Sequence, residues 1–352
     1  MRRPTFRALP TLLWLLLATS GVAAQTPAAP KAPEALWYMT DGEASVQSFL
    51  AHADRITIVA PQVFMMDSAG TVWGAVDARV VATARARHVQ LVPLVMNPGF
   101  DQASFHRVLN VPDARRRAVH NLAALCREQH FAGLQFDFEN VHVADRDAFT
   151  AFARESADSL HAVGCTLSAA VVPRAGEFPG PTAYHGWIYD NWRGVYDYKA
   201  LADALDFISL MTYAEHTGGT PPGPVAGYPW MRQALDYVLS LGVPPAKISL
   251  GIPSYSDWWY PDYDARTGPR MRGRDISYAT GTGLLARHDV KPVWDDAQKT
   301  LYAFWSNDGI NEFLFLEDAR AFAAKLALVR EHGLRGYSVW VLGLEDPKVW
   351  ER

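Results

Sequence analysis

The sequence lacks the features that mark several large classes of protein. Its 33 basic and 37 acidic side chains leave a formal net charge of −4, so no basic excess predicts nucleic acid as a partner. Only two cysteines, Cys126 and Cys165, occur in 352 residues, which excludes a disulfide-rich scaffold. Whether they are bonded or free is open, because sequence separation does not fix proximity. Neither an H-E-x-x-H motif nor clustered Cys and His residues occurs, so no metal or other cofactor is implied.

Long apolar runs are also scarce, and the most prominent one lies at the start of the chain. A positively charged beginning precedes an apolar run over residues 9–22, which is followed by small residues. This order predicts a signal peptide over residues 1–24, with an uncleaved anchor as the alternative. The Pro- and Ala-rich residues 25–34 are then a disordered leader. We expect a secreted or periplasmic monomer whose mature chain has no membrane span.

Hydrophobic residues are plentiful, at 49% of the total, and they form short runs that alternate with stretches of helical length. This alternation predicts an α/β protein whose catalytic domain, residues 35–352, is a (β/α)8 TIM barrel. The expected strands cover residues 36–39, 55–59, 89–95, 133–138, 166–171, 207–211, 247–251 and 336–341. Helical patterns include residues 77–87, 113–129, 145–163, 228–241 and 317–332.

One long segment interrupts the alternation. Residues 254–316 separate the seventh strand from the last helix and are too long for an ordinary loop. We expect a small α+β insertion there, on the catalytic side of the barrel. Within it, residues 281–286 (GTGLLA) match a dinucleotide-binding pattern, but no convincing strand precedes them. We therefore predict a loop that leads into a helix.

The fourth expected strand carries the clearest chemical signal. Gln135, Asp137 and Glu139 alternate with apolar residues, so the three polar side chains share the face directed at the barrel axis. Active sites of such barrels lie at the carboxyl ends of the strands. Two neighbouring carboxyls in a semi-enclosed site do not both ionise easily, which favours a general acid. The alternative is a structural acid cluster paired with Arg or Lys.

These residues resemble the fourth-strand signature D-G-x-D-x-D-x-E of the family 18 glycoside hydrolases, the chitinase-like family. The chain has AGLQFDFE over residues 132–139, so the final D-x-E is intact. Met211-Thr212-Tyr213 resembles the family's sixth-strand M-x-Y, and Trp340 resembles the eighth-strand tryptophan beneath the sugar. Within the family, the chain is most similar to bacterial spore-cortex and cell-wall N-acetylglucosaminidases, without their LysM modules.

The resemblance implies substrate-assisted hydrolysis of glycans that contain β-linked N-acetylglucosamine, such as peptidoglycan or chitin. Glu139 is then the acid and base, Asp137 orients the acetamido group, Tyr213 holds its carbonyl oxygen, and Trp340 stacks under the ring. The partner is an N-acetylated aminosugar oligosaccharide or polysaccharide.

Three positions depart from the family pattern, and the first is Ala132, which replaces the first Asp of the signature at a position read as structural. Gln135 stands where many chitinases have Asp, so an amide that hydrogen bonds to Asp137 replaces a carboxyl, and Ala214 follows Tyr213 where Asp is common. A catalytically weak or inactive, lectin-like glycan-binding protein is therefore the alternative function.

Further substrate-binding candidates lie in strand-end loops or at the start of the insertion. Gln135 and Met211 belong to the two motifs, whereas Asn97 follows the third strand and Glu215 follows the sixth-strand motif. Trp258 opens the insertion and either stacks on sugars or belongs to the insertion's own core. Residues of lower rank are Arg174, Glu177, Trp192, His142, His185 and His216.

Overall fold

The computed structural model describes residues 1, 4–5, 32–217 and 220–351, and the compact unit that carries every described helix and strand is Pro33–Arg352. The predicted signal peptide and disordered leader lie almost wholly outside the described residues. Among the described residues, no helix combines the length and the apolar character that crossing a membrane requires.

Pro33–Arg352 is built around a closed ring of eight parallel strands, which confirms the predicted barrel. Closure is complete because β1 pairs with both β2 and β15. In ring order the strands are β1 (Glu34–Met39), β15 (Gly336–Trp340), β9 (Ile248–Pro253), β8 (Phe207–Leu210), β7 (Thr166–Val171), β6 (Gly133–Phe136), β5 (Leu94–Met96) and β2 (Ile58–Met66). Two short strands, β3 (Val72–Trp73) and β4 (Gln90–Leu91), pair with β2.

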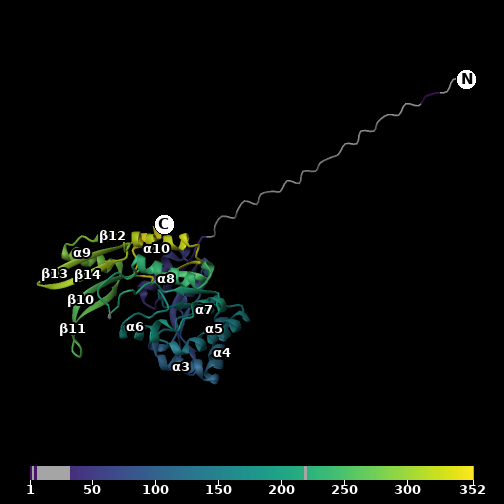
Figure 1. Ribbon diagram of the computed structural model, residues 1–352, viewed down its shortest axis with the longest axis horizontal. Helices are drawn as coiled ribbons and strands as arrows, with labels where there is room; N and C mark the ends of the chain where they lie inside the picture. The colour runs from purple at the N-terminus through teal and green to yellow at the C-terminus, as the bar shows by residue number, and fades with distance from the viewer. Residues whose placement is uncertain (2–3, 6–31, 218–219, 352) are drawn as a thin grey trace. The chain divides into compact units, whose positions relative to one another are not determined.

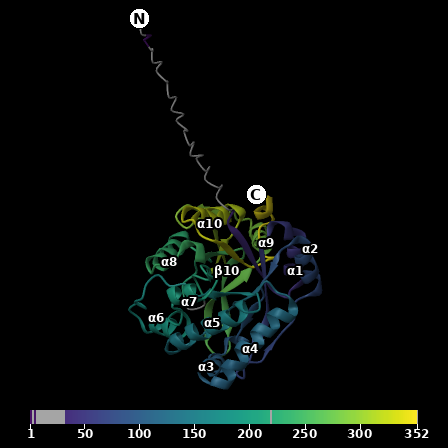
Figure 2. The ribbon, with the colours of Figure 1, turned by 90° about the vertical axis from the view of Figure 1, so that its right-hand side faces the viewer.

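Helices surround the strands (Figure 2). Several begin where the sequence offers an Asp cap: Asp77 accepts a hydrogen bond from the N–H of Arg79, and Asp318 accepts one from Ala321. The helices outside the insertion are α1 (Glu43–His52), α2 (Ala78–Arg87), α3 (Gln102–Asn110), α4 (Pro112–Gln129), α5 (Arg146–His161), α6 (Ala183–Ile188), α7 (Tyr198–Ala204), α8 (Tyr228–Ser240) and α10 (Ala319–Glu331).

The predicted insertion is an antiparallel sheet with one helix, seen beside the barrel in Figure 1. It contains β10 (Ser256–Asp264), β11 (Gly268–Ile276), α9 (Tyr278–His288), β12 (Val293–Asp295), β13 (Thr300–Asn307) and β14 (Ile310–Leu316). The expected loop at residues 281–286 is wrong, because these residues lie inside α9. A Cβ on Gly281 would stand 2.5 Å from Cδ1 of Leu316, so glycine lets the helix approach β14 closely.

The apolar side chains of β6 and of the residues just after it fix the orientation of the polar side chains between them. Phe136 stacks on Phe152 of α5 with ring centroids 5.4 Å apart, and Phe138 stacks on Phe105 of α3 at 3.9 Å. All four rings are buried. Because successive side chains point to opposite faces, this packing turns Gln135 and Asp137 toward the barrel axis, as the alternation predicts.

Candidate active site

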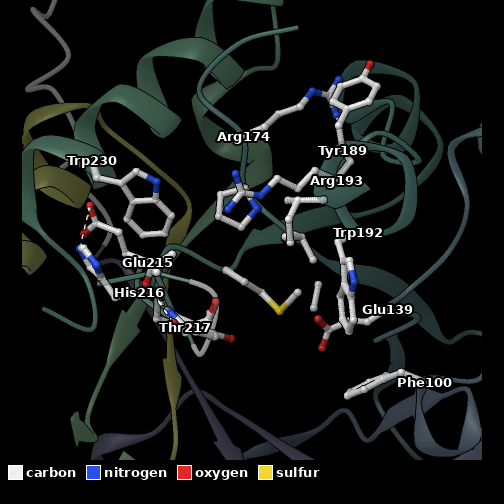
Figure 3. A pocket seen from close by; sticks show the side chains of 18 of the residues that line it. Phe100, Glu139, Arg174, Tyr189, Trp192, Arg193, Glu215, His216, Thr217 and Trp230 are labelled. Atoms are coloured by element: carbon white, nitrogen blue, oxygen red, sulfur yellow. Dashed lines mark hydrogen bonds and ion pairs between the residues drawn. The ribbon is translucent and has the colours of Figure 1, made fainter. Parts of the chain in front are cut away.

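A large cavity opens at the carboxyl ends of the barrel strands. Its volume is about 1470 Å³, above the ~300–1,000 Å³ of typical small-molecule pockets, and it is roomy enough for a chain of several sugars. The segment after β7 completes one wall through Trp192 among others (Figure 3). The insertion contributes Asp275. The strand ends contribute Tyr38, Gln62, Asn97, Asp137, Glu139, Met211, Tyr213 and Trp340.

Glu139 is held by its backbone rather than by its carboxyl group. The Asn97 side chain accepts a hydrogen bond from the N–H of Glu139 at 3.2 Å and donates one to its carbonyl oxygen at 2.9 Å. The next residue, Asn140, has φ of 51°, a left-handed conformation that Asn tolerates better than most residues. Its side chain donates to the carbonyl oxygen of Phe100. The carboxyl group of Glu139 is thereby directed into the cavity and left free for a ligand (Figure 3).

The two carboxyls that follow β6, at positions 137 and 139, have strongly altered acidity. Burial raises the pKa of Glu139 to about 8, and the negative charge of nearby Asp137 contributes to that rise. Burial also raises the pKa of Asp137 to about 6, against an opposing hydrogen bond from Gln62. Glu139 therefore holds a proton at neutral pH, whereas Asp137 is mostly ionised. This is the division between an acid and a charge stabiliser that glycoside cleavage uses.

The predicted hydrogen bond between Gln135 and Asp137 is wrong. Gln135 is fully buried beneath the cavity, where its amide donates to Ser168 at 2.9 Å and to Ser209 at 3.3 Å, and its oxygen accepts from Tyr38 at 2.7 Å. It links β6 to three other strands, β1, β7 and β8, and does not line the cavity. The amide beside Asp137 is instead Gln62 of β2, which donates to Oδ2 at 3.3 Å.

Tyr213, Met211 and Trp340 all line the cavity, as expected for ligand-binding residues. Burial, together with the negative charge of Asp137, raises the pKa of the Tyr213 hydroxyl well above its ordinary value, so this hydroxyl stays a hydrogen-bond donor. The Trp340 ring lies 5.6 Å from that of Tyr38, centroid to centroid, and the two rings form an aromatic wall.

Of the two remaining candidates, Glu215 lines the cavity and Trp258 does not. Glu215 lines the cavity, but one of its oxygens accepts a hydrogen bond at 2.6 Å from the N–H of Gly227, just before α8. Its second oxygen lies 3.8 Å from Nε2 of His216. Trp258 does not line this cavity: its indole donates to Glu312 and its ring packs on Tyr260, within the insertion.

Of the lower-ranked candidates, some line the cavity and others do not. Arg174, Trp192, His185 and His216 line the cavity, whereas the side chains of His142 and Glu177 are not part of its lining. Sequence reasoning also missed lining residues, of which Gln62 and Arg193 are examples. Gln62 lies in a strand longer than expected, and Arg193 ends a π-helical turn that no recognisable sequence motif marks.

Comparisons with known proteins agree with this geometry. Residues 48–345 match the glycosyl hydrolases family 18. A cortical fragment-lytic enzyme of Bacillus subtilis is 28% identical over 263 residues, which cover 74% of this chain and 58% of that protein. The chain thus spans less than two thirds of that relative.

Solved structures show the same similarity. A chitinase from Chromobacterium violaceum superposes with a TM-score of 0.80 at 28% identity, covering 91% of this chain and 97% of that one. The Bacillus megaterium spore cortex-lytic enzyme SleL has the same fold, with a TM-score of 0.79 at 24% identity over 91% of this chain and 72% of its own. The family match covers most of the chain, and the fourth-strand signature, the barrel and the cavity agree with it, so this protein belongs to glycosyl hydrolases family 18.

Proposed function

We propose that this protein is an exported glycosidase that hydrolyses glycans containing β-linked N-acetylglucosamine, with retention of configuration. The observation that carries the proposal is Glu139, a carboxyl that opens into a large cavity and remains protonated at neutral pH beside the mostly ionised Asp137. The names of the relatives, a cortical fragment-lytic enzyme and a chitinase, support N-acetylated aminosugar polymers as the substrate class.

In the first step, Glu139 donates its proton to the glycosidic oxygen while the substrate's own acetamido oxygen attacks the anomeric carbon. The bond to the leaving sugar breaks, and a positively charged oxazolinium ion forms. Asp137 stabilises that charge and orients the acetamido N–H, and Tyr213 donates to the acetamido oxygen. In the second step, Glu139 removes a proton from the water that attacks the anomeric carbon.

The pKa values predict how turnover depends on pH. Glu139 must start protonated, so activity falls as pH rises through about 8; Asp137 must be ionised, so activity also falls as pH drops through about 6. Since the two groups interact, these limbs belong to the pair rather than to either residue alone.

The test compares the parent with Glu139→Gln on peptidoglycan and on chito-oligosaccharides, with products identified by mass and by anomeric form. We expect β-anomeric products from the parent and a loss of at least ~100-fold in the variant, because the amide has no proton to transfer. The matched control is Glu128→Gln, since Glu128 is exposed and its ion-pair contact is Arg127, outside the cavity. Turnover by Glu139→Gln close to that of the parent would refute the assignment of the acid.

A second experiment tests the nucleophile. Oligosaccharides de-N-acetylated at the cleaved sugar should bind without being cleaved, since they lack the attacking oxygen. Efficient cleavage, or a sugar ester on Asp137 detected by mass spectrometry, would contradict substrate assistance. Binding of intact N-acetylated glycans with no turnover in the parent would favour the lectin-like alternative.

A further inference from the structure

Arg193 is a cation that lines the cavity without a carboxylate partner. It ends the π-helical turn Tyr189–Arg193, which also carries Trp192, and Figure 3 shows its side chain reaching toward the middle of the cavity. Over residues 32–217 and 220–351, no acidic side chain lies within ion-pair distance of its guanidinium, and that guanidinium makes no hydrogen bond.

The acidic groups of the same region are occupied elsewhere. Glu177, the carboxylate of this loop, accepts hydrogen bonds from Arg146, Arg174, Tyr189 and Tyr237. Asp197 caps α7 by accepting from the N–H of Ala200, and Asp190 is exposed. Arg193 is therefore not part of this ion-pair network.

Arg174 provides the contrast within one loop. Its guanidinium has several partners through its two terminal nitrogens: it pairs with Glu177, lies 4.6 Å from the ring centroid of Tyr198, and donates to the carbonyl oxygens of Arg193 and Tyr196. The last two bonds fix the backbone from which the Arg193 side chain extends. One arginine thus holds the turn in place, and the other is presented to the cavity.

A guanidinium that is largely buried and has no anionic partner is energetically unfavourable. Burial lowers the pKa of Arg193, so its environment disfavours the charged form, yet an arginine stays charged at any physiological pH. A desolvated cation gains strongly from an anion that enters beside it. The planar fork of the side chain fits a carboxylate through two parallel hydrogen bonds.

We propose that Arg193 binds a carboxylate of the substrate, and that the preferred substrates are N-acetylated aminosugar polymers that carry carboxylates. The inference rests on the proposed glycosidase function and narrows its substrate class. Neutral chitin-type chains lack this group, whereas peptidoglycan carries carboxylates on the lactyl ether of its muramic acid and on its peptides. Trp192, next to Arg193, offers a ring against which the sugar that bears the carboxylate can pack.

Equilibrium binding tests the proposal independently of turnover. Dissociation constants are measured for peptide-free peptidoglycan strands, for strands with peptides, and for both after conversion of their carboxyls to amides. We expect the parent to bind the carboxylate forms at least ~10-fold more tightly than the amidated forms. This ratio should fall to near one in Arg193→Gln and be partly retained in Arg193→Lys, which keeps the charge but not the fork. A preference confined to strands with peptides would identify the peptide as the source of the carboxylate.

Controls separate this inference from the proposed function. Arg127→Gln removes an exposed positive charge outside the cavity and should keep the parent ratio, and thermal melting confirms that each variant is folded. A parent ratio near one, or an unchanged ratio in Arg193→Gln, overturns the inference even when the enzyme hydrolyses both polymers. Absence of hydrolysis in the parent with the expected binding ratios contradicts the proposed function and leaves the assignment of Arg193 standing.

Discussion

At the scale of single residues, the acidity of Asp137 depends on a neighbour from another strand. Gln62 donates to Asp137 and favours its charged form, which opposes the rise in pKa that burial causes. The residue that hydrogen bonds to the Asp137 carboxylate is thus Gln62 of β2. Gln135 instead lies beneath the cavity, where its side chain links β6 to β1, β7 and β8.

We predict that Gln62→Leu moves the acidic limb of the pH–rate profile to higher pH. Without the donated hydrogen bond, the pKa of Asp137 rises above about 6, so a larger fraction is protonated and inactive under mildly acidic conditions. The measurement is kcat/KM against pH for the parent and the variant. Gln47→Leu serves as the control, because Gln47 bonds to Glu43 on the exposed face of α1. Profiles that superimpose after scaling would show that Gln62 does not tune Asp137.

Sequence alone identified the residues on the fourth strand because alternation is a local property. Asp137, Glu139, Tyr213 and Trp340 lie in short motifs, and all of them line the cavity. The partner of Asp137 was missed because a hydrogen bond between strands depends on register, which the apolar run around Gln62 does not reveal.

At the scale of elements, periodicity located the strands better than it located their ends. The fifth strand was expected at residues 166–171 and is observed as β7, Thr166–Val171. The second strand is expected at residues 55–59 but is observed as β2, Ile58–Met66. The expected strand therefore stops before Gln62, which lies inside the observed one. The third divides into β4 and β5. Strand ends depend on pairing with neighbours, and this information is not local.

A covalent link between elements answers a question that the sequence leaves open. Cys126 near the end of α4 and Cys165 just before β7 form a disulfide, with Cα atoms 6.5 Å apart. Both cysteines precede strands, so the bond lies at the end of the barrel opposite the cavity. It also joins residues 39 positions apart, which restricts the unfolded chain.

Removal of this disulfide should therefore destabilise the fold without changing the chemistry. For a loop of this length, chain entropy gives about 4 kcal/mol, so Cys126→Ser with Cys165→Ser should unfold at a clearly lower temperature. The kcat at a temperature where both forms are folded should match that of the parent. Calorimetry and steady-state kinetics on the same preparations check both statements. An unchanged Tm, or a large fall in kcat, would contradict this division between stability and function.

At the scale of the whole molecule, the barrel and its insertion together enclose the site. The ion pair between Lys325 of α10 and Glu317, next to β14, is buried and connects the insertion to the helical layer. Thr300 of β13 also donates to Glu317. The insertion in turn contributes Asp275 to the cavity wall. The strand order was predictable from sequence, but this buried contact was not, because neither side chain lies in a pattern that marks it as paired.

The acid at the centre of the cavity should also influence the stability of the whole fold. The pKa of Glu139 is about 8 in the folded protein, against 4.5 for an ordinary glutamate. Between these values the folded protein keeps a proton that the unfolded chain has already released. The unfolded state then binds fewer protons, so the free energy of unfolding falls as pH rises from about 4.5 to about 8.

Glu139→Gln removes this titration, so the variant should become more stable than the parent as pH rises. The difference in Tm between variant and parent should grow from pH 5 to pH 8 and level off above it, because beyond the folded-state pKa both states of the parent have lost the proton. Asp137 titrates in both proteins and largely cancels in the comparison. Thermal unfolding in a series of buffers of equal ionic strength, with Glu128→Gln as the exposed control, measures the trend. A Tm difference that stays constant across this range would mean that Glu139 ionises as an ordinary surface carboxyl, and the acid assigned to the mechanism would then be deprotonated at neutral pH.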